Sequence, residues 1–429
     1  MTRTAFITTA LLVAMMQTNR AAAQGSLGYL QEDKVISFDP SSLFGVTLAM
    51  QGDTLAVMSP SHFQMGVNQD VVYIFTRSGT AWNQQASFTG SDSELGDRFG
   101  FSLAIDGDTL VAGSIFDNVL GPDQGSAYVF VRNGTNWVEQ AHLIASDGGP
   151  GDKFGQTVDI SGDTIVVGSP LEEPTGTVTD NIGAAYVFVR TGQTWTEQAK
   201  LTASDAAPDD WLGSAVAIDG NTIVASAMSA DGPAGEDQGA VYVFTRNGTS
   251  WSEQATIYAD DASGNAYMGE GAISLSGDTV AVASPLWGLY FVGEGPVSPG
   301  AAYVFVRNGS TWSQQARLTS SDASIDAQYF SGGGISIDGD LLVVGHIEAD
   351  GPVEDDQGTA YVFRRSGSTW SEVSRLIAND AQYGDLLGQG IAIDGDRIAV
   401  GAPADDEITT NQGSAYVFRV LTPDSIVLS

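Results

Sequence analysis

The fold is decided by residues 156–201, which read QTVDISGDTIVVGSPLEEPTGTVTDNIGAAYVFVRTGQTWTEQAKL. Four runs of residues suited to β-strands follow one another in it, at Gln156–Ile160, Thr164–Gly168, Ala184–Arg190 and Thr194–Leu201. Ser161-Gly162 joins the first two runs and Thr191-Gly192 joins the last two, and such dipeptides supply the positive φ angles of tight hairpin turns. This stretch therefore predicts four antiparallel strands in chain order.

The same unit recurs seven times with a period of about 58 residues. A Tyr-x-Phe motif marks the third predicted strand of each unit: Tyr73–Phe75, Tyr128–Phe130, Tyr186–Phe188, Tyr242–Phe244, Tyr303–Phe305, Tyr361–Phe363 and Tyr416–Phe418. A Trp lies seven residues after each of the first six Phe residues: Trp82, Trp137, Trp195, Trp251, Trp312 and Trp370. A Gly-Asp or Gly-Asn pair precedes each motif, beginning at Gly52, Gly107, Gly162, Gly220, Gly277, Gly339 and Gly395. Four-stranded units in such an array are typical of propeller blades.

The two middle strands of each unit are apolar on both faces, as Ile165–Val167 and Tyr186–Val189 show. Strands of this kind belong to sheets that are covered on both faces, and blades stacked around an axis cover one another. The sequence thus predicts an all-β protein, a seven-bladed β-propeller of four-stranded antiparallel blades.

The last unit ends after its third strand and has no Trp. Residues 29–35, Tyr-Leu-Gln-Glu-Asp-Lys-Val, resemble the fourth strand at Trp195–Leu201, although no blade precedes them. We therefore expect residues 28–37 to complete the last blade and close the ring. Ser425–Leu428 is the competing candidate for the same edge, because Ser425 lies seven residues after Phe418.

These repeats place the propeller at residues 24–420, with a tail at 421–429. The units fall near residues 40–95, 96–150, 151–208, 209–264, 265–325, 326–383 and 384–420. Residues 1–23 combine a cationic start, an apolar stretch at Ala5–Met16 and small residues at Ala21–Ala23. This order is typical of a secretory signal peptide, so we expect a secreted or cell-surface protein.

The formal charge of −35 is one-sided, and the chain contains no cysteine. An acidic surface repels nucleic acid and anionic membranes and favours cations or cationic partners, although it also simply maintains solubility. After the leader no apolar run is long enough to span a bilayer. We expect a monomer without nucleic-acid binding or membrane insertion, stable without disulfides because a chain of this length buries a large core.

The up-and-down strand order divides the connections between two faces. The tight turns within strand pairs 1–2 and 3–4 form the turn face. The links between strands 2 and 3 and the crossings from strand 4 to the next blade form the long-loop face. Acidic residues gather in these links, and as candidate weak Ca²⁺ ligands we single out Asp350, Glu354, Asp355, Asp356, Asp405 and Asp406. The crossings repeat Asp pairs five residues apart, which either cap backbone N–H groups or bind a divalent cation: Asp92/Asp97, Asp147/Asp152, Asp205/Asp210 and Asp380/Asp385.

The chain resembles the FG-GAP repeat family, which includes the head propeller of integrin α chains. Phe44-Gly45, Phe99-Gly100 and Phe154-Gly155 carry the first half of the motif, and Gly401-Ala402-Pro403 carries the second. The resemblance implies a seven-bladed propeller that binds proteins or glycans at a surface, often with calcium. The family's calcium loop lies between the first and second strands, where this chain has only a two-residue turn, so we do not expect calcium there.

Catalytic signals are weak. His62, His142 and His346 occupy three different repeats, and no nucleophile triad, metal-binding His cluster or nucleotide loop is present. The sequence therefore favours a secreted, non-catalytic binding or adhesion module whose acidic loop face meets a protein or polysaccharide. The alternatives are a secreted glycan-active enzyme that uses loop carboxylates and a structural surface component.

Overall fold

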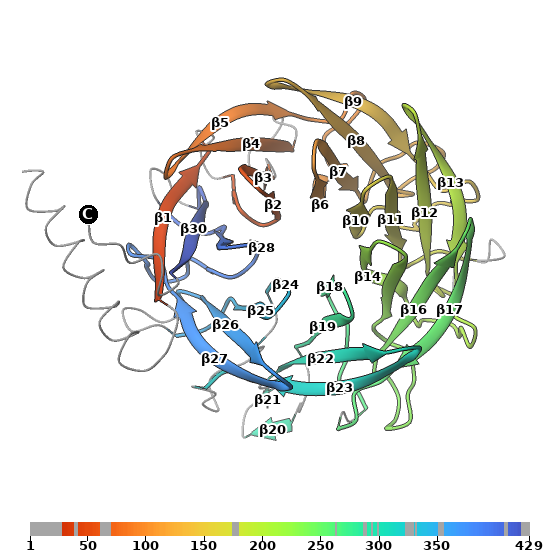
Figure 1. The fold of residues 1–429 in the computed structure, drawn as a ribbon. Helices are drawn as coiled ribbons and strands as arrows, with labels where there is room; N and C mark the ends of the chain where they lie inside the picture. The colour runs from red at the N-terminus through yellow and green to blue at the C-terminus, as the bar shows by residue number, and fades with distance from the viewer. Residues whose placement is uncertain are drawn as a thin grey trace, which may run out of the picture.

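A computed structural model gives the fold for residues 28–37, 42–60, 70–173, 180–261, 264–285, 290–292, 295–297, 300–321, 330, 333–350, 356–406 and 411–421. In these ranges the chain forms strands, bridges and turns, which build seven four-stranded sheets around a central axis (Figure 1). This confirms the predicted seven-bladed propeller. The same ranges contain no helix that is long and apolar enough to cross a membrane.

The blades are numbered in chain order, and every sheet runs from the axis outwards. Blade 1 comprises β2 (Leu48–Gln51), β3 (Thr54–Ser59), β4 (Val71–Ser78) and β5 (Ala81–Phe88). Blade 2 comprises β6 (Phe99–Asp106), β7 (Thr109–Ser114), β8 (Ser126–Asn133) and β9 (Asn136–Leu143). Blade 3 comprises β10 (Val158–Ser161), β11 (Thr164–Ser169), β12 (Ala184–Thr191) and β13 (Thr194–Leu201). Blade 4 comprises β14 (Leu212–Asp219), β15 (Thr222–Ala227), β16 (Ala240–Asn247) and β17 (Ser250–Ile257).

The remaining three blades follow the same order. Blade 5 comprises β18 (Ile273–Ser276), β19 (Thr279–Ser284), β22 (Ala301–Asn308) and β23 (Thr311–Leu318). Blade 6 comprises β24 (Ile335–Asp338), β25 (Leu341–His346), β26 (Thr359–Ser366) and β27 (Thr369–Leu376). Blade 7 comprises β28 (Ile391–Asp394), β29 (Arg397–Ala402), β30 (Ser414–Leu421) and, from the other end of the chain, β1 (Gly28–Ile36).

The core lies between the blades. All six residues of β11 are buried, as are the first five of β12, because neighbouring blades cover both faces of the middle strands. Phe154, from the Phe-Gly motif, packs edge-on against Tyr186 and Phe188 with ring centroids 5.5 and 6.0 Å apart. The repeated aromatic residues therefore form a buried cluster of the same kind in successive blades.

The N-terminal strand closes the ring, as predicted. β1 pairs with β30 in antiparallel register, with Gln31 opposite Phe418 and Lys34 opposite Tyr416, and the two strands lie side by side in Figure 1. A bulge between Gln31 and Asp33 reproduces the bulge that the fourth strand of each other blade contains. The competing segment Ser425–Leu428 lies outside the described residues.

A circle of seven hydrogen bonds joins the blades on the turn face. In each one, the Gly N–H of a 1–2 turn donates to the last side chain of the preceding blade's first strand. The donor–acceptor pairs are Gly52–Asp394, Gly107–Gln51, Gly162–Asp106, Gly220–Ser161, Gly277–Asp219, Gly339–Ser276 and Gly395–Asp338. Each Gly-Asp or Gly-Asn pair thus contributes a blade-to-blade contact as well as a turn. The bond from Gly52 to Asp394 links blade 1 to blade 7.

The outer Trp residues also join blades. The Trp195 indole N–H donates a hydrogen bond to Gln140 of the preceding blade at 2.9 Å. The Arg190 guanidinium lies over the Trp195 ring in a cation–π contact. Arg190 in turn binds Asp163 of its own blade and Thr109 of the preceding one. Blades 4, 5 and 6 repeat this arrangement around Trp251, Trp312 and Trp370. Burying each ring stabilises the fold by up to about 5 kcal/mol.

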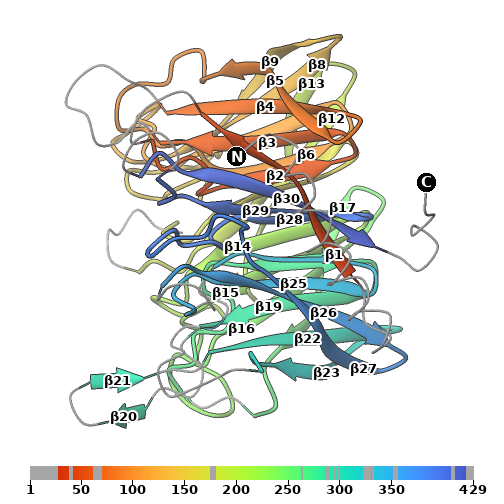
Figure 2. The same cartoon turned by 90° about the vertical axis from the view of Figure 1, so that its left-hand side faces the viewer.

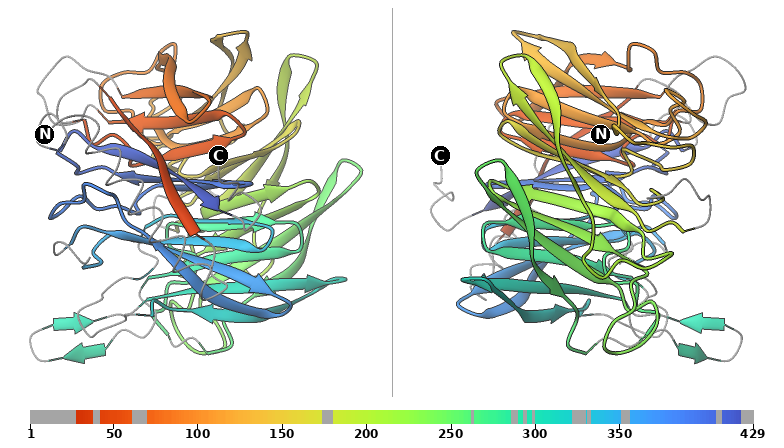
Figure 3. Two further views of the ribbon diagram at one scale, coloured as in Figure 1. Left: turned by 60° about the vertical axis from the view of Figure 1, so that its left-hand side comes forward. Right: turned by 90° about the vertical axis from the view of Figure 1, so that its right-hand side faces the viewer.

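Blade 5 departs from the repeat. The link between β19 and β22 contains an extra hairpin, β20 (Tyr290–Val292) and β21 (Gly295–Val297), which the sequence analysis did not predict. The hairpin projects beyond the disc, as the side views show (Figures 2 and 3).

Candidate functional site

The repeated Asp pairs of the crossings stabilise the scaffold. The second Asp accepts a hydrogen bond from the backbone N–H three residues before it, as Asp152 does from Gly149 at 2.6 Å. The first Asp accepts from the Tyr hydroxyl of the next blade, as Asp147 does from Tyr186 at 2.8 Å. The same bonds recur in blades 2, 4 and 7. The hydrogen bonds agree with the structural interpretation of these pairs.

Asp405, one of the candidate calcium ligands, is 1 % exposed and has its own partners. Its carboxylate lies 2.8 Å from the Lys34 ammonium and accepts a hydrogen bond from Ser414. Glu172 pairs with Lys200 in the corresponding place in blade 3, and Asp117 pairs with His142 at 3.1 Å in blade 2. Each of these acids pairs with a basic side chain of the fourth strand in its own blade.

The other candidate ligands close loops where the structure describes them. The Asp350 carboxylate accepts the backbone N–H of Asp356 at 3.2 Å, and Asp406 accepts that of Asn411. Glu354 and Asp355 lie outside the described residues. In the described ranges no three acidic, His or Cys side chains converge to hold a metal ion. Weak Ca²⁺ binding on this face therefore stays a prediction.

A motif that the sequence analysis missed ends several of the 2–3 links. Gln124, Gln238, Gln357 and Gln412 each precede a glycine and are at most 1 % exposed. Gln124 accepts the backbone N–H of Leu120, and Gln238 accepts that of Ala234, so the amide holds the loop from inside. The recurrence of Asp-Gln-Gly or Asn-Gln-Gly at one repeat position was the available signal.

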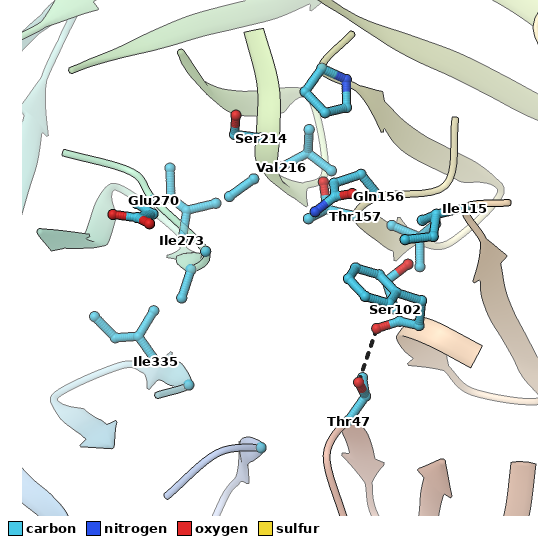
Figure 4. A pocket seen from close by; sticks show the side chains of 18 of the residues that line it. Thr47, Ser102, Ile115, Gln156, Thr157, Ser214, Val216, Glu270, Ile273 and Ile335 are labelled. Atoms are coloured by element: carbon cyan, nitrogen blue, oxygen red, sulfur yellow. Dashed lines mark hydrogen bonds between the residues drawn. The ribbon is translucent and has the colours of Figure 1, made fainter. Parts of the chain in front are cut away.

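A large opening lies on the axis, at the long-loop face. A cavity of about 1150 Å³ is lined by the start of the first strand and the end of the second strand of successive blades (Figure 4). Its wall is mainly apolar, with Phe101, Phe116, Trp211, Ile273 and Ile335 among the contributors. Concave, largely apolar sites with a few polar groups are the usual form of ligand-binding sites.

The two sides of this cavity differ. Thr47, Ser102 and Thr157 occupy one repeat position in blades 1 to 3, and their hydroxyls donate to backbone carbonyls of the next blade at 2.9, 2.9 and 3.3 Å. Two of the corresponding positions in later blades are Gly271 and Gly390. A Cβ added at Gly271 would meet no atom within 4 Å. The wall is therefore more open beside blade 5 than beside blades 1 to 3.

The charged groups of the lining are unevenly placed. Lys153 comes from blade 3 and pairs with Asp123 at 3.3 Å, whereas Glu270 and Glu348 come from blades 5 and 6. Burial raises the pKa of Glu270 above its usual range. Burial and the nearby Asp356 charge raise the pKa of Glu348. The open side of the cavity is thus acidic.

Left-handed residues recur in the crossings, and two of them, Lys153 and Trp211, line the cavity. The residue before each Phe-Gly, Leu-Gly or Met-Gly pair has positive φ, at Leu43 (48°), Arg98 (59°), Lys153 (59°), Trp211 (62°), Tyr267 (48°) and Leu386 (60°). Such a conformation costs about 1–2 kcal/mol for a residue with a Cβ, so the crossing must hold it in place. For Trp211, the Ser214 backbone N–H and hydroxyl both donate to its carbonyl, at 3.2 and 2.7 Å.

Comparison with known families gives a match over the repeats. The sequence pattern described as FG-GAP repeat matches residues 82–130, 137–188, 195–244, 312–363 and 370–418, which together make up more than half of the chain. Each matched segment begins on the fourth strand of one blade and ends on the third strand of the next. No curated protein matches the chain.

Proposed function

Because this chain belongs to the FG-GAP repeat family, whose propellers are commonly binding or adhesion modules, we propose that it is a secreted, non-catalytic binding module. Its long-loop face would meet a protein or polysaccharide partner. The proposed secretion rests on the predicted leader at residues 1–23, which lies outside the described residues.

One observation carries this proposal. Most repeated residues of the long-loop face have scaffold partners, yet the position after the Phe-Gly pair lines the cavity with a different chemistry in nearly every blade: Val46, Phe101, Gln156, Ser214, Glu270 and Gln389. A purely structural position would select similar residues each time, as the Tyr-x-Phe position does. Variation on a rigid frame is how propellers and other scaffolds carry binding sites.

The test is a screen of residues 24–429 on a glycan array and on immobilised extracellular-matrix proteins, with hydrolysis of glycan substrates assayed in parallel. We expect saturable binding without turnover. Turnover would favour the enzyme alternative, and absence of both binding and turnover would favour a structural surface component.

A further inference from the structure

The cavity lining includes polar side chains that the scaffold does not use. Gln156, Gln389, Glu270 and Glu348 come from four blades, and within the described residues none of these side chains has a hydrogen-bond or ion-pair partner. This contrasts with the acids of the crossings and with Thr47, Ser102 and Thr157, whose polar atoms join parts of the frame. Polar side chains without scaffold partners in a cavity are available to a ligand.

The lining also contains the aromatic ring of Trp211, which lies in the crossing that leads into blade 4. Its indole N–H is shielded from solvent and makes no hydrogen bond within the described ranges, as is also true of the Trp82 and Trp137 indoles on fourth strands. The ring of Trp211, rather than this N–H, is therefore what the cavity offers to a ligand. Blades 4 and 5, which supply Trp211 and Glu270, are neighbours.

The combination selects a ligand chemistry. An anion would accept hydrogen bonds from the amide N–H groups of Gln156 and Gln389 but would be repelled by Glu270, Glu348 and a chain of formal charge −35. A cation would pair with the carboxylates but would leave these amide N–H groups without a partner. A hydroxyl both donates and accepts, so it serves every one of these groups.

We propose that the axial cavity binds a neutral saccharide, whose hydroxyls bond Gln156, Gln389 and Glu270 while a sugar face packs on Trp211. This inference rests on the proposed binding function and narrows its partner to a carbohydrate. The cavity lies just above the range of about 300–1,000 Å³ that is usual for small-molecule sites. It therefore has room for a short oligosaccharide or the end of a polysaccharide chain.

The chain itself supplies variants that suit the fold. Trp211→Leu introduces the residue that blades 1 and 7 carry at this left-handed position, Leu43 and Leu386. Glu270→Gln introduces the residue that blades 3 and 7 carry, Gln156 and Gln389. Tyr383→Ala is a control, because this aromatic side chain is 69 % exposed and does not line the cavity.

The experiment is isothermal titration of residues 24–429 with neutral oligosaccharides of glucose, galactose, mannose and N-acetylglucosamine, and with acidic oligosaccharides and alkylamines. We expect one class of neutral sugar to bind, an affinity loss of about tenfold or more in Trp211→Leu and Glu270→Gln, and no loss in Tyr383→Ala. Thermal unfolding of each variant establishes that it is folded.

Four results would overturn the inference. Equal affinity in all variants would place the sugar elsewhere, and preference for acidic sugars or amines would refute the ligand chemistry. Failure of every sugar, with binding retained to an immobilised protein, would refute the saccharide but not the binding function. Failure of both would refute the two proposals together.

Discussion

Blade 3 and blade 7 contain the same ion-pair cluster on different chain connections. In blade 3, Lys200 lies 2.7 Å from Asp147, within a sequence separation of 53 residues. In blade 7, Lys34 lies 2.7 Å from Asp380, across 346 residues. Both ammonium groups also approach a Tyr ring, at 5.5 and 5.1 Å. The blade geometry therefore determines the contacts, whichever end of the chain supplies the fourth strand.

The two blades differ in what closure costs and in how the outer edge is packed. The larger sequence separation adds about 1.6 kcal/mol to the entropic cost of closing blade 7. Tyr29 and Val420 occupy the positions that Trp195 and Arg190 occupy in blade 3. Packing in an apolar cluster that also includes Leu341 of blade 6 therefore replaces the Trp–Arg–Thr link. Blade 7 must therefore hold the ring shut with fewer polar contacts to its neighbour.

Deleting residues 24–37 should have the largest effect. It removes β1, uncovers the edge of β30 and leaves Asp405 buried without its cation, a loss that alone costs about 3–5 kcal/mol. We expect the melting temperature to fall by about 10 °C or more in differential scanning calorimetry. Truncation after Leu421, which removes the competing segment, is the matched control and should change little. The opposite ranking would contradict closure by β1.

Lys34→Met and Lys200→Met compare the two clusters directly. Each removes the cation from two acids, of which one is buried, Asp405 at 1 % or Glu172 at 2 % exposure, so each should cost about 3–5 kcal/mol in urea unfolding. The loss at Lys34 should be at least as large, because this residue also secures the seam. Adding Asp405→Asn to Lys34→Met should recover part of it. Equal stability of Lys34→Met and the parent chain would show that the seam does not depend on the ion pair.

Asp159 gives blade 3 a pH dependence that blade 7, with Ala392 at the same position, does not have. Burial raises the pKa of Asp159 to about 7, and its carboxylate accepts the Ile218 N–H of blade 4 at 2.7 Å. Asp159 ionises near pH 4 in the unfolded chain but only near pH 7 in the folded chain. The free energy of unfolding therefore falls as the pH rises through this interval. The largest loss of folding stability that this pKa shift can cause is about 4 kcal/mol.

Asp159→Ser tests that dependence with a residue that the repeat already uses. Ser274 of blade 5 and Ser336 of blade 6 accept the equivalent N–H groups of the following blades. At pH 8 we expect the variant to be more stable than the parent by about 2 kcal/mol, and at pH 4 the advantage should vanish. Chemical denaturation at both pH values is the measurement. A pH-independent difference would refute ionisation as its cause.

Tyr29→Phe should have the smallest effect. The Tyr29 hydroxyl is shielded from solvent and has no hydrogen-bond partner within the described residues, and burial strongly raises its pKa. Removing it should stabilise the chain by up to about 1 kcal/mol, visible as a slightly higher melting temperature. The reverse sign would indicate that a water serves the hydroxyl in solution.

The fold was predictable because its determinants recur. Tyr-x-Phe, Gly-Asp and Trp each occupy one place in the blade, and the likeness of Tyr29–Val35 to Trp195–Leu201 sufficed to identify the closing strand. The partner of Asp405 was harder to foresee, because an ion pair across the ring leaves no local pattern. Aligning Lys34 with Lys200 and Asp405 with Glu172 would have predicted it.

The candidate site was not predictable for the opposite reason. Gln156, Glu270 and Trp211 differ from the residues at their repeat positions in neighbouring blades, and a search for recurrence passes over such differences. The extra hairpin β20–β21 was missed for a related reason, since it occurs in blade 5 and the described parts of the other blades contain no such hairpin as a template.

The antiparallel seam also has a mechanical consequence. Gly28 faces Leu421, so the outer ends of β1 and β30 leave the ring side by side. Tension applied between these two ends would peel the backbone hydrogen bonds apart one after another, whereas shear would load them together. A molecule held by one end alone transmits no force through this seam. A molecule pulled from both ends opens first at blade 7, while the six continuous blades carry little of the load.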